Sequence, residues 1–303
     1  MTWERTLEMN IKSEFSRFHP TVQFIYFTSV IFFAMFIREP VFIGISLIFS
    51  ILYSTYLGGK KALKAIFAFI VPMFLLIAVI NPLFNHAGVT IWFYLPDGNP
   101  FTMESLVYGI VSGGLFSCTM LWCICLRYIM TSDKIIYLFG RVAPKLSLLI
   151  SMILRFIPKL SAHFREVRNA RKNIGCDITD GNFKERIGNG VRIISAVLQW
   201  VMENSIDTAN SLESRGYGLA RRTAFSLFKI EKRDVIIILA VLICDICVIW
   251  GYFGGILEFE YFPMISELRI NVPLILVYVI LCIMPLILDI MEGRKWRYTE
   301  LKI

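Results

Sequence analysis

Two arginines lie near the ends of two long amphipathic segments of this 303-residue chain. Arg171 precedes Gly175 by a few residues, and Arg215 is followed directly by Gly216. A glycine just past a helix end is a common left-handed cap, and basic side chains in the last turn interact favourably with the helix dipole. An exposed guanidinium on a rigid helix tip can also bind a carboxylate of a partner protein. The spacing alone favours the plain helix stop.

A single carboxyl group, Asp245, falls in the middle of an apolar stretch. An acid at membrane depth is a candidate for proton relay or ion coupling. A structural hydrogen bond to a polar group on a neighbouring helix is an equally good interpretation, because one acid without a basic partner makes a poor relay. Two function classes therefore stay open: a transporter scaffold, and an ion-coupled carrier or membrane-embedded enzyme that uses Asp245.

Other catalytic or ligand-binding chemistry finds little support. Residues 58–61 (Gly-Gly-Lys-Lys) lack the upstream glycine and the following hydroxyl of a phosphate-binding loop, so we expect no ATP binding. The histidines, His19, His86 and His163, are far apart in the chain, which argues against a metal site. We expect them to be solvated or interfacial. The sequence predicts no catalytic residue, no cofactor and no metal.

The composition places these residues in a membrane protein. Hydrophobic residues make up 56% of the chain, charged residues 18%, and the mean hydropathy is +0.65. A helix needs about 20 apolar residues to cross the hydrocarbon core. The prediction is an all-α polytopic membrane protein with about six transmembrane helices, at 21–37, 40–58, 63–82, 105–126, 235–253 and 272–290.

Residues 135–160 are apolar enough to suggest a seventh span, but charge argues against it. Arg141, Lys145, Arg155 and Lys159 interrupt the stretch. Its apolar residues recur at the spacing of one helical face. We predict an amphipathic helix at the membrane interface.

The basic residues set the topology. With both termini in the cytoplasm, 29 of the 31 Lys and Arg residues are cytoplasmic, and Arg38 and Arg269 are outside. This asymmetry follows the positive-inside rule. It also accounts for the net charge of +8 without nucleic acid, for which no recognised motif is present.

The predicted organisation has three parts: a membrane part at 1–126, a cytoplasmic insertion at 127–234 and a second membrane part at 235–303. The insertion is predicted to hold two long amphipathic coupling helices, from about Pro144 to Lys172 and from about Phe183 to Arg215. Their apolar stripes are too short and too charged to span, so each faces lipid or another protein. The stripes comprise Leu146, Leu149, Ile150, Ile153, Leu154, Ile157, Val191, Ile194, Val197, Leu198 and Val201.

Several motifs resemble those of a known membrane-protein family. The chain resembles the transmembrane T component of energy-coupling factor (ECF) ABC transporters. The similarity lies in residues 151–158, in Ala170-Arg171, and in residues 206–218 followed by 221–223. Residues 18–21, 88–90 and 103–105 resemble its earlier motifs more weakly.

The resemblance implies a coupling role without catalysis. In that family, two helix-terminal Ala-Arg-Gly motifs dock onto two cytoplasmic ABC ATPase subunits, and a separate membrane S component binds the vitamin or metal ion. The second motif corresponds to Ser214, Arg215 and Gly216, with serine in the first place. The first corresponds to Ala170 and Arg171 and lacks its glycine, for which Gly175 is a substitute cap. The resemblance implies a bacterial or archaeal cell membrane.

Overall fold

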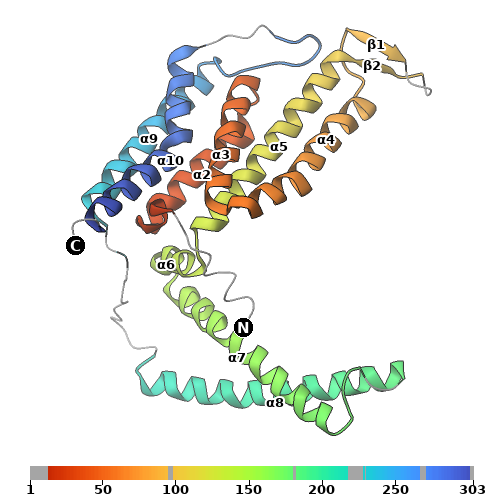
Figure 1. Ribbon diagram of the computed structural model, residues 1–303, viewed down its shortest axis with the longest axis vertical. Helices are drawn as coiled ribbons and strands as arrows, with labels where there is room; N and C mark the ends of the chain where they lie inside the picture. The colour runs from red at the N-terminus through yellow and green to blue at the C-terminus, as the bar shows by residue number, and fades with distance from the viewer. Residues whose placement is uncertain are drawn as a thin grey trace. The chain divides into compact units, whose positions relative to one another are not determined.

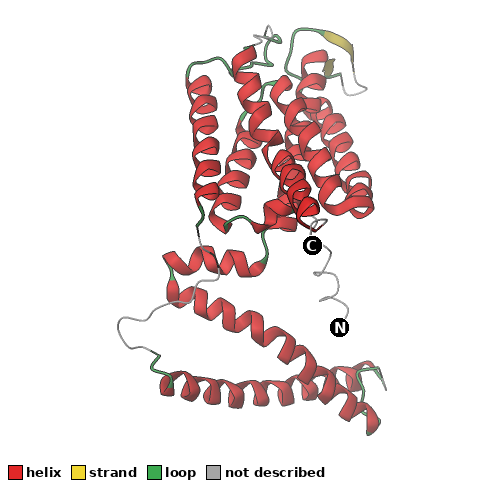
Figure 2. Cartoon of the chain, turned by 60° about the vertical axis from the view of Figure 1, so that its left-hand side comes forward, coloured by secondary structure: helices red, strands yellow, loops and turns green. Residues whose placement is uncertain are grey.

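The structure is a computed structural model, and it describes residues 13–94, 98–179, 182–217, 228, 230–266 and 271–300. These residues are mostly helical, with one short β-hairpin (Figure 1, Figure 2). The chain divides into two compact units. One is Met1–Lys134 with Phe228–Ile303, which we call the membrane unit, and the other is Ile135–Leu227, which we call the coupling unit.

The membrane unit begins with a 3-10 turn and then contains six α-helices, one π-helical turn and the hairpin within its described residues. A seventh helix, α6, begins in this unit and continues into the coupling unit. In chain order the elements are η1 (Glu14–Arg17), α2 (Pro20–Phe36), α3 (Pro40–Ala65), η2 (Ile66–Ile70), α4 (Val71–Phe84), β1 (Ile91–Tyr94), β2 (Pro100–Thr102), α5 (Met103–Ile129), α6 (Ser132–Val142), α7 (Pro144–Asn173), α8 (Phe183–Ser214), α9 (Lys232–Phe253) and α10 (Val272–Glu300). Helices α7 and α8 belong to the coupling unit, and α9 and α10 return to the membrane unit.

Local sequence explains where several helices begin. Pro20, Pro40 and Pro144 stand at the first helical position, where the missing N–H is not needed and the fixed φ suits a helix. Helix α8 begins with a capping box, in which Asn182 and Glu185 each accept a backbone N–H of the first turn.

Five helical segments of the described chain are long and apolar enough to cross a membrane. The chain is therefore an all-α, multi-pass membrane protein, as predicted. Helix α2 is apolar but has only 17 residues, fewer than the about 20 that a perpendicular span needs. The five segments are Pro40–Phe84, Met103–Ile129, Leu146–Asn173, Lys232–Phe253 and Val272–Met291.

The 45-residue segment Pro40–Phe84 contains two of the predicted spans. Gly59 breaks the helix, with φ 53° and ψ −137°, a left-handed conformation that favours glycine. Figure 1 shows the chain changing direction between α3 and α4. The break lies between the predicted spans at 40–58 and 63–82, so this helical segment contains both of them.

Helix α7 is also long and apolar enough to cross a membrane, over its segment Leu146–Asn173. None of the side chains in its most apolar stretch is buried, and the charged side chains of Arg155 and Lys159 are exposed along it. Its placement at the interface rather than across the membrane stays a prediction.

The core of the membrane unit is built around α5, which packs against α2, α3 and α4. Trp122 of α5 is fully buried, and its ring contacts those of Tyr26, Phe27 and Tyr53 at centroid distances of 6.2–6.5 Å. Its indole N–H donates to Ser46 Oγ at 2.9 Å. The polar edge of the tryptophan is thus satisfied inside the helix bundle.

Helices α4 and α5 approach closely through glycine. A Cβ on Gly109 would lie 2.8 Å from the carbonyl oxygen of Ala78, and one on Gly113 would lie 3.0 Å from that of Phe74. Both obstacles are helix backbone, which cannot rotate away as a side chain can. The Gly-xxx-Gly spacing in α5 therefore allows close helix packing.

Replacing Gly109 by valine should destabilise the membrane unit. The added atoms force α4 and α5 apart, and overpacking of this kind costs about 1–3 kcal/mol. Thermal unfolding in detergent should show a lower midpoint for Gly109→Val. Gly44→Val is the matched control, because Gly44 has no neighbouring atom within 4 Å of its ideal Cβ. Equal midpoints for both variants would show that the close approach does not matter.

Candidate functional site

Helix α7 ends in a Schellman cap just beyond Arg171. Gly175 has φ 71°, which is the left-handed conformation of such a cap. The N–H of Cys176 donates to the carbonyl of Arg171 at 3.0 Å, and the N–H of Gly175 donates to that of Lys172 at 3.0 Å. These two bonds satisfy carbonyl groups that would otherwise lack partners at the helix end. Gly175 thus supplies the cap that the first motif lacks at its own third position.

Helix α8 ends in the same cap. Gly216 has φ 75°, the N–H of Tyr217 donates to the carbonyl of Leu212 at 3.0 Å, and the N–H of Gly216 donates to that of Glu213 at 2.9 Å. The two consecutive long helices therefore end in the same way.

The two arginines nevertheless hold different positions in their caps. Arg215 directly precedes the left-handed glycine and its side chain is exposed. Arg171 lies four residues before Gly175, and its side chain is half-buried. The residue of α7 that corresponds to Arg215 is Ile174, which is 73% exposed. The resemblance pairs the two arginines, but the geometry of the helix ends does not make them equivalent.

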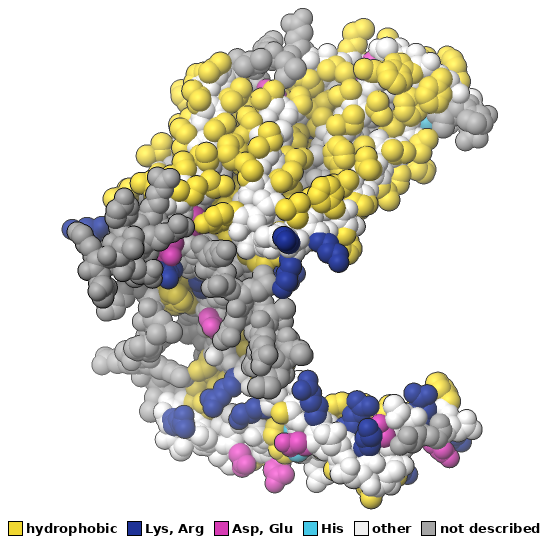
Figure 3. Space-filling model, in the orientation of Figure 1, with side chains coloured by type: hydrophobic (Ala, Val, Ile, Leu, Met, Phe, Trp, Pro, Cys, Tyr) yellow, Lys and Arg dark blue, Asp and Glu magenta, His cyan; other side chains and the backbone are white. Residues whose placement is uncertain are grey.

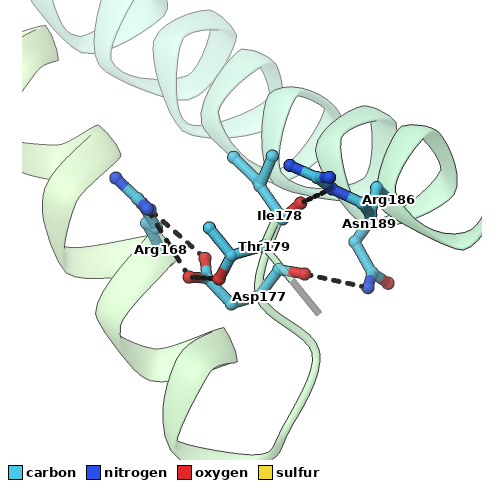
Figure 4. Close-up of polar contacts among 6 residues, drawn as sticks. All are labelled: Arg168, Asp177, Ile178, Thr179, Arg186 and Asn189. Carbon is cyan, nitrogen blue, oxygen red and sulfur yellow. Dashed lines mark hydrogen bonds and ion pairs between the residues drawn. The ribbon is translucent and has the colours of Figure 1, made fainter. Parts of the chain in front are cut away.

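A polar elbow joins the end of α7 to the beginning of α8 (Figure 4). The carboxylate of Asp177, which is buried, accepts hydrogen bonds from Arg168 Nε at 3.2 Å and Thr179 Oγ1 at 2.8 Å. From α8, Arg186 Nε donates to the carbonyl of Ile178 at 2.8 Å and Asn189 Nδ2 donates to that of Asp177 at 3.2 Å. Both helices are thereby bonded to the same short connection, which makes the α7 tip a rigid feature.

Electrostatics favour the ionised elbow. The hydrogen bond from Arg168, followed by that from Thr179, lowers the pKa of Asp177 from its ordinary 3.8 to about 2. Because the folded form holds the charged carboxylate, the stabilisation is complete above pH 4 and is lost only as the pH falls toward 2. The elbow therefore stays closed throughout the physiological range.

Removing the Asp177 carboxylate should loosen this connection. Asp177→Ala leaves Arg168 and Thr179 without their shared acceptor, so backbone amides from 174 to 189 should exchange hydrogen faster. Hydrogen–deuterium exchange at pH 7 measures this directly, and we expect at least a fivefold increase in rate. Glu166→Ala is the control, since Glu166 is an exposed acid on α7 that pairs with His163 and lies outside the elbow. An elbow equally protected in both variants would contradict the role of Asp177.

Helices α7 and α8 also pack through apolar side chains. Ile193 and Val197 are the buried residues of α8, and Trp200 on the same face stacks on His163 of α7 at 4.3 Å between centroids. The prediction that Val197 lies on an outward-facing stripe is therefore wrong, because this packing leaves it only 7% exposed. The inward face of α8 runs through residues 193, 197 and 200, so Val197 is the one residue that it shares with the predicted stripe.

The rest of the predicted stripes is accessible in the coupling unit. Figure 3 shows hydrophobic side chains interspersed with many Lys and Arg side chains on α7 and α8, whereas hydrophobic side chains dominate the visible face of the membrane unit. Ile150 and Val201 are partly exposed. The exposed members are Leu146, Leu149, Ile153, Leu154, Ile157, Val191, Ile194 and Leu198.

Asp245 has a structural partner. Ser29 Oγ of α2 donates to its Oδ2 at 2.6 Å, which links α2 to α9 inside the membrane unit. This contact supports the structural interpretation of the acid over ion coupling. The expectation that the histidines are solvated or interfacial is wrong for His19, which is only 5% exposed because it lies at the buried start of α2.

The chain is similar to known membrane transport proteins. The family model described as "Cobalt transport protein" (CbiQ) matches residues 12–225. The energy-coupling factor transporter transmembrane protein EcfT of Lactococcus lactis is 32% identical over 106 residues, which cover 35% of this chain and 40% of the relative. EcfT 1 of Listeria monocytogenes is 27% identical over 196 residues, covering 60% of this chain and 69% of the relative. The match to the Lactococcus relative thus spans less than half of that protein's length.

Proposed function

Because the chain belongs to the CbiQ family, as a transmembrane T component of the ECF type, we propose that it is the coupling subunit of an ECF importer. In this role it transmits the conformational change of two cytoplasmic ABC ATPase subunits to a membrane S component. The S component binds the vitamin or metal ion, and the chain itself catalyses no reaction.

The observation that carries the proposal is the pair of capped helix ends, at Gly175 and Gly216, of which the first is held by a rigid connection. Arg215 is exposed at the tip of α8, and the α7 tip is held by the Asp177 elbow. A planar guanidinium on a fixed backbone is suited to a carboxylate in a groove, because little conformational freedom is lost on binding. We place one ATPase at each tip, with Arg215 as the contact on α8 and Arg171, with Ala170 beside it, on α7.

The charge distribution supports a cytoplasmic coupling unit. The insertion at 127–234 carries 19 basic and 10 acidic residues, which the positive-inside rule places in the cytoplasm together with both termini. ATPases bind there. The chain has no phosphate-binding loop in its sequence, so the energy for transport comes from these partners.

The exposed stripes supply the other half of the mechanism. Closure of the ATPase dimer on ATP would draw the two tips together, and rigid helices would carry that displacement along their length. Leu149 and Ile153 of α7, and Ile194 and Leu198 of α8, are apolar and exposed on those helices. We propose that they hold the S component or the lipid surface, so that tip movement tilts the S component and releases its ligand inward.

Loss of the tip arginine should weaken ATPase binding. Truncating one partner of a buried charge-assisted contact costs about 2–5 kcal/mol, which is at least a 30-fold rise in Kd. The affinity of purified ATPase dimer for the detergent-solubilised chain should fall by that factor in Arg215→Ala. Arg171→Ala should show a smaller loss, because that side chain is half-buried within its own helix.

Arg192→Ala is the control, since Arg192 is exposed midway along α8 and away from its tip. It should bind the ATPases as the unchanged chain does. If Arg171→Ala, Arg215→Ala and the double variant all retain full affinity, tip docking is wrong.

A further inference from the structure

The segment Ser13–His19, which we call the pre-span segment, is largely buried within the membrane unit. Phe15 is fully buried and Phe18 is 2% exposed. Phe15 lies edge-on to Tyr26 and Phe27 of α2, with ring centroids 5.7 and 6.3 Å away. The seven-residue stretch before α2 is thus part of the core of the membrane unit.

Its beginning is fixed by α10. The carboxylate of Asp289, itself 2% exposed, accepts hydrogen bonds from Ser13 Oγ at 2.9 Å and from the Phe15 N–H at 2.6 Å. Tyr53 of α3 donates to the same carboxylate at 3.2 Å. One acid on the last helix therefore binds the 3-10 turn and α3 together.

Its middle is fixed by Lys134 and Gln23. Lys134 Nζ lies within hydrogen-bond distance of four oxygens: Ser16 O at 2.6 Å, Ser16 Oγ at 2.9 Å, Ile129 O at 2.9 Å and Gln23 Oε1 at 3.1 Å. The Gln23 amide nitrogen donates to the carbonyls of Phe15 and Phe18, both at 2.9 Å. This ammonium group thereby joins the pre-span segment, α2 and the end of α5.

Its end is fixed by the chain that returns from the coupling unit. The His19 ring lies edge-on to Phe228 at 6.4 Å, and the His19 N–H donates to Asp234 Oδ1 at 3.4 Å. The guanidinium of Arg233 lies 5.0 Å from the centre of the Phe18 ring.

These contacts share one topological property. The coupling unit is Ile135–Leu227, so Lys134 is the last residue before it and Phe228 is the first after it. Both residues contact the same seven-residue segment, which is bound in turn to α2, α3 and α10. Any displacement that leaves the coupling unit through its two chain connections meets this segment first.

We propose that the pre-span segment is the anchorage through which movement of the coupling unit reaches the membrane helices, with Lys134 as its main positioning residue. This inference rests on the proposed coupling function. The burial of an ammonium group supports it, because such a group is costly to desolvate and is held here by neutral oxygens of the pre-span segment, α2 and the end of α5.

The test is hydrogen–deuterium exchange on the purified complex with its ATPase subunits, in ADP and after trapping with ATP and vanadate. In the unchanged chain, exchange should change at the α8 tip, residues 212–217, and also in α2 and α10. Lys134→Met should keep the change at the tip and lose the changes in α2 and α10. A purely structural role would alter exchange equally in both nucleotide states.

Lys64→Met is the matched control, because Lys64 is exposed at the end of α3 and its replacement should leave both responses intact. Ser16→Ala is a milder second variant, which removes one of the four oxygens and should at least halve the response in α2 and α10. The inference is overturned if both variants transmit the full response to α2 and α10. A tip that does not respond to ATP in the unchanged complex would instead refute the proposed function.

Discussion

The burial of Lys134 is the constraint on which the rest of the arrangement depends. Lys134 is only 7% exposed, and its ammonium makes no ion pair with an acid of the described chain. Desolvation lowers its pKa to about 8, so it remains mostly protonated at neutral pH. An unpaired buried charge is tolerated only where hydrogen bonds replace water, and three N–H groups fix the surrounding oxygens in place. The point at which the chain enters the coupling unit is therefore rigid.

A second rigid connection, the Asp177 elbow, lies inside the coupling unit. Between Lys134 and the end of α7 the chain is helical except at Ala143, and α8 is one helix from Phe183 to Ser214. The α7–α8 contact around Ile193, Val197 and Trp200 holds the two long helices together. Rigid parts joined at defined points are what a coupling subunit needs, because flexible parts would absorb the displacement. In the proposed mechanism, the buried polar contacts at the joints transmit the movement, while the apolar stripes supply binding surface.

The sequence was sufficient to predict those features that depend on local pattern. Apolar length located the apolar helices of the membrane unit, and glycine position located both helix ends, including the substitute cap at Gly175. Helical periodicity found the stripes of α7 and α8 but assigned Val197 to the outer face. An amphipathic helix with apolar residues at 191, 193, 194, 197, 198 and 201 has a wide stripe, and only the packed partner helix decides which side is buried.

Contacts between residues far apart in the chain cannot be predicted from local sequence pattern. Ser13 and Asp289 are 276 positions apart, and Ser16 and Lys134 are 118 apart. Nothing in the local sequence around Lys134 indicates a buried ammonium group, because lysine is usually exposed. The same applies to Asp177, whose role depends on Arg168 and on residues of the following helix. Buried charges at joints are visible only when the chain is folded.

Site-specific photo-cross-linking in the intact complex tests the central claim most directly, namely that the tips of α7 and α8 face the ATPases. Benzoylphenylalanine would replace Ile174 and Tyr217, which are 73% and 46% exposed at the two helix ends, and Tyr94, which is 66% exposed in the β-hairpin. The account predicts cross-links to an ATPase subunit from positions 174 and 217 and none from position 94. Cross-links from position 94 to the ATPase, or none from either helix tip in a complex that contains the ATPases, would contradict it.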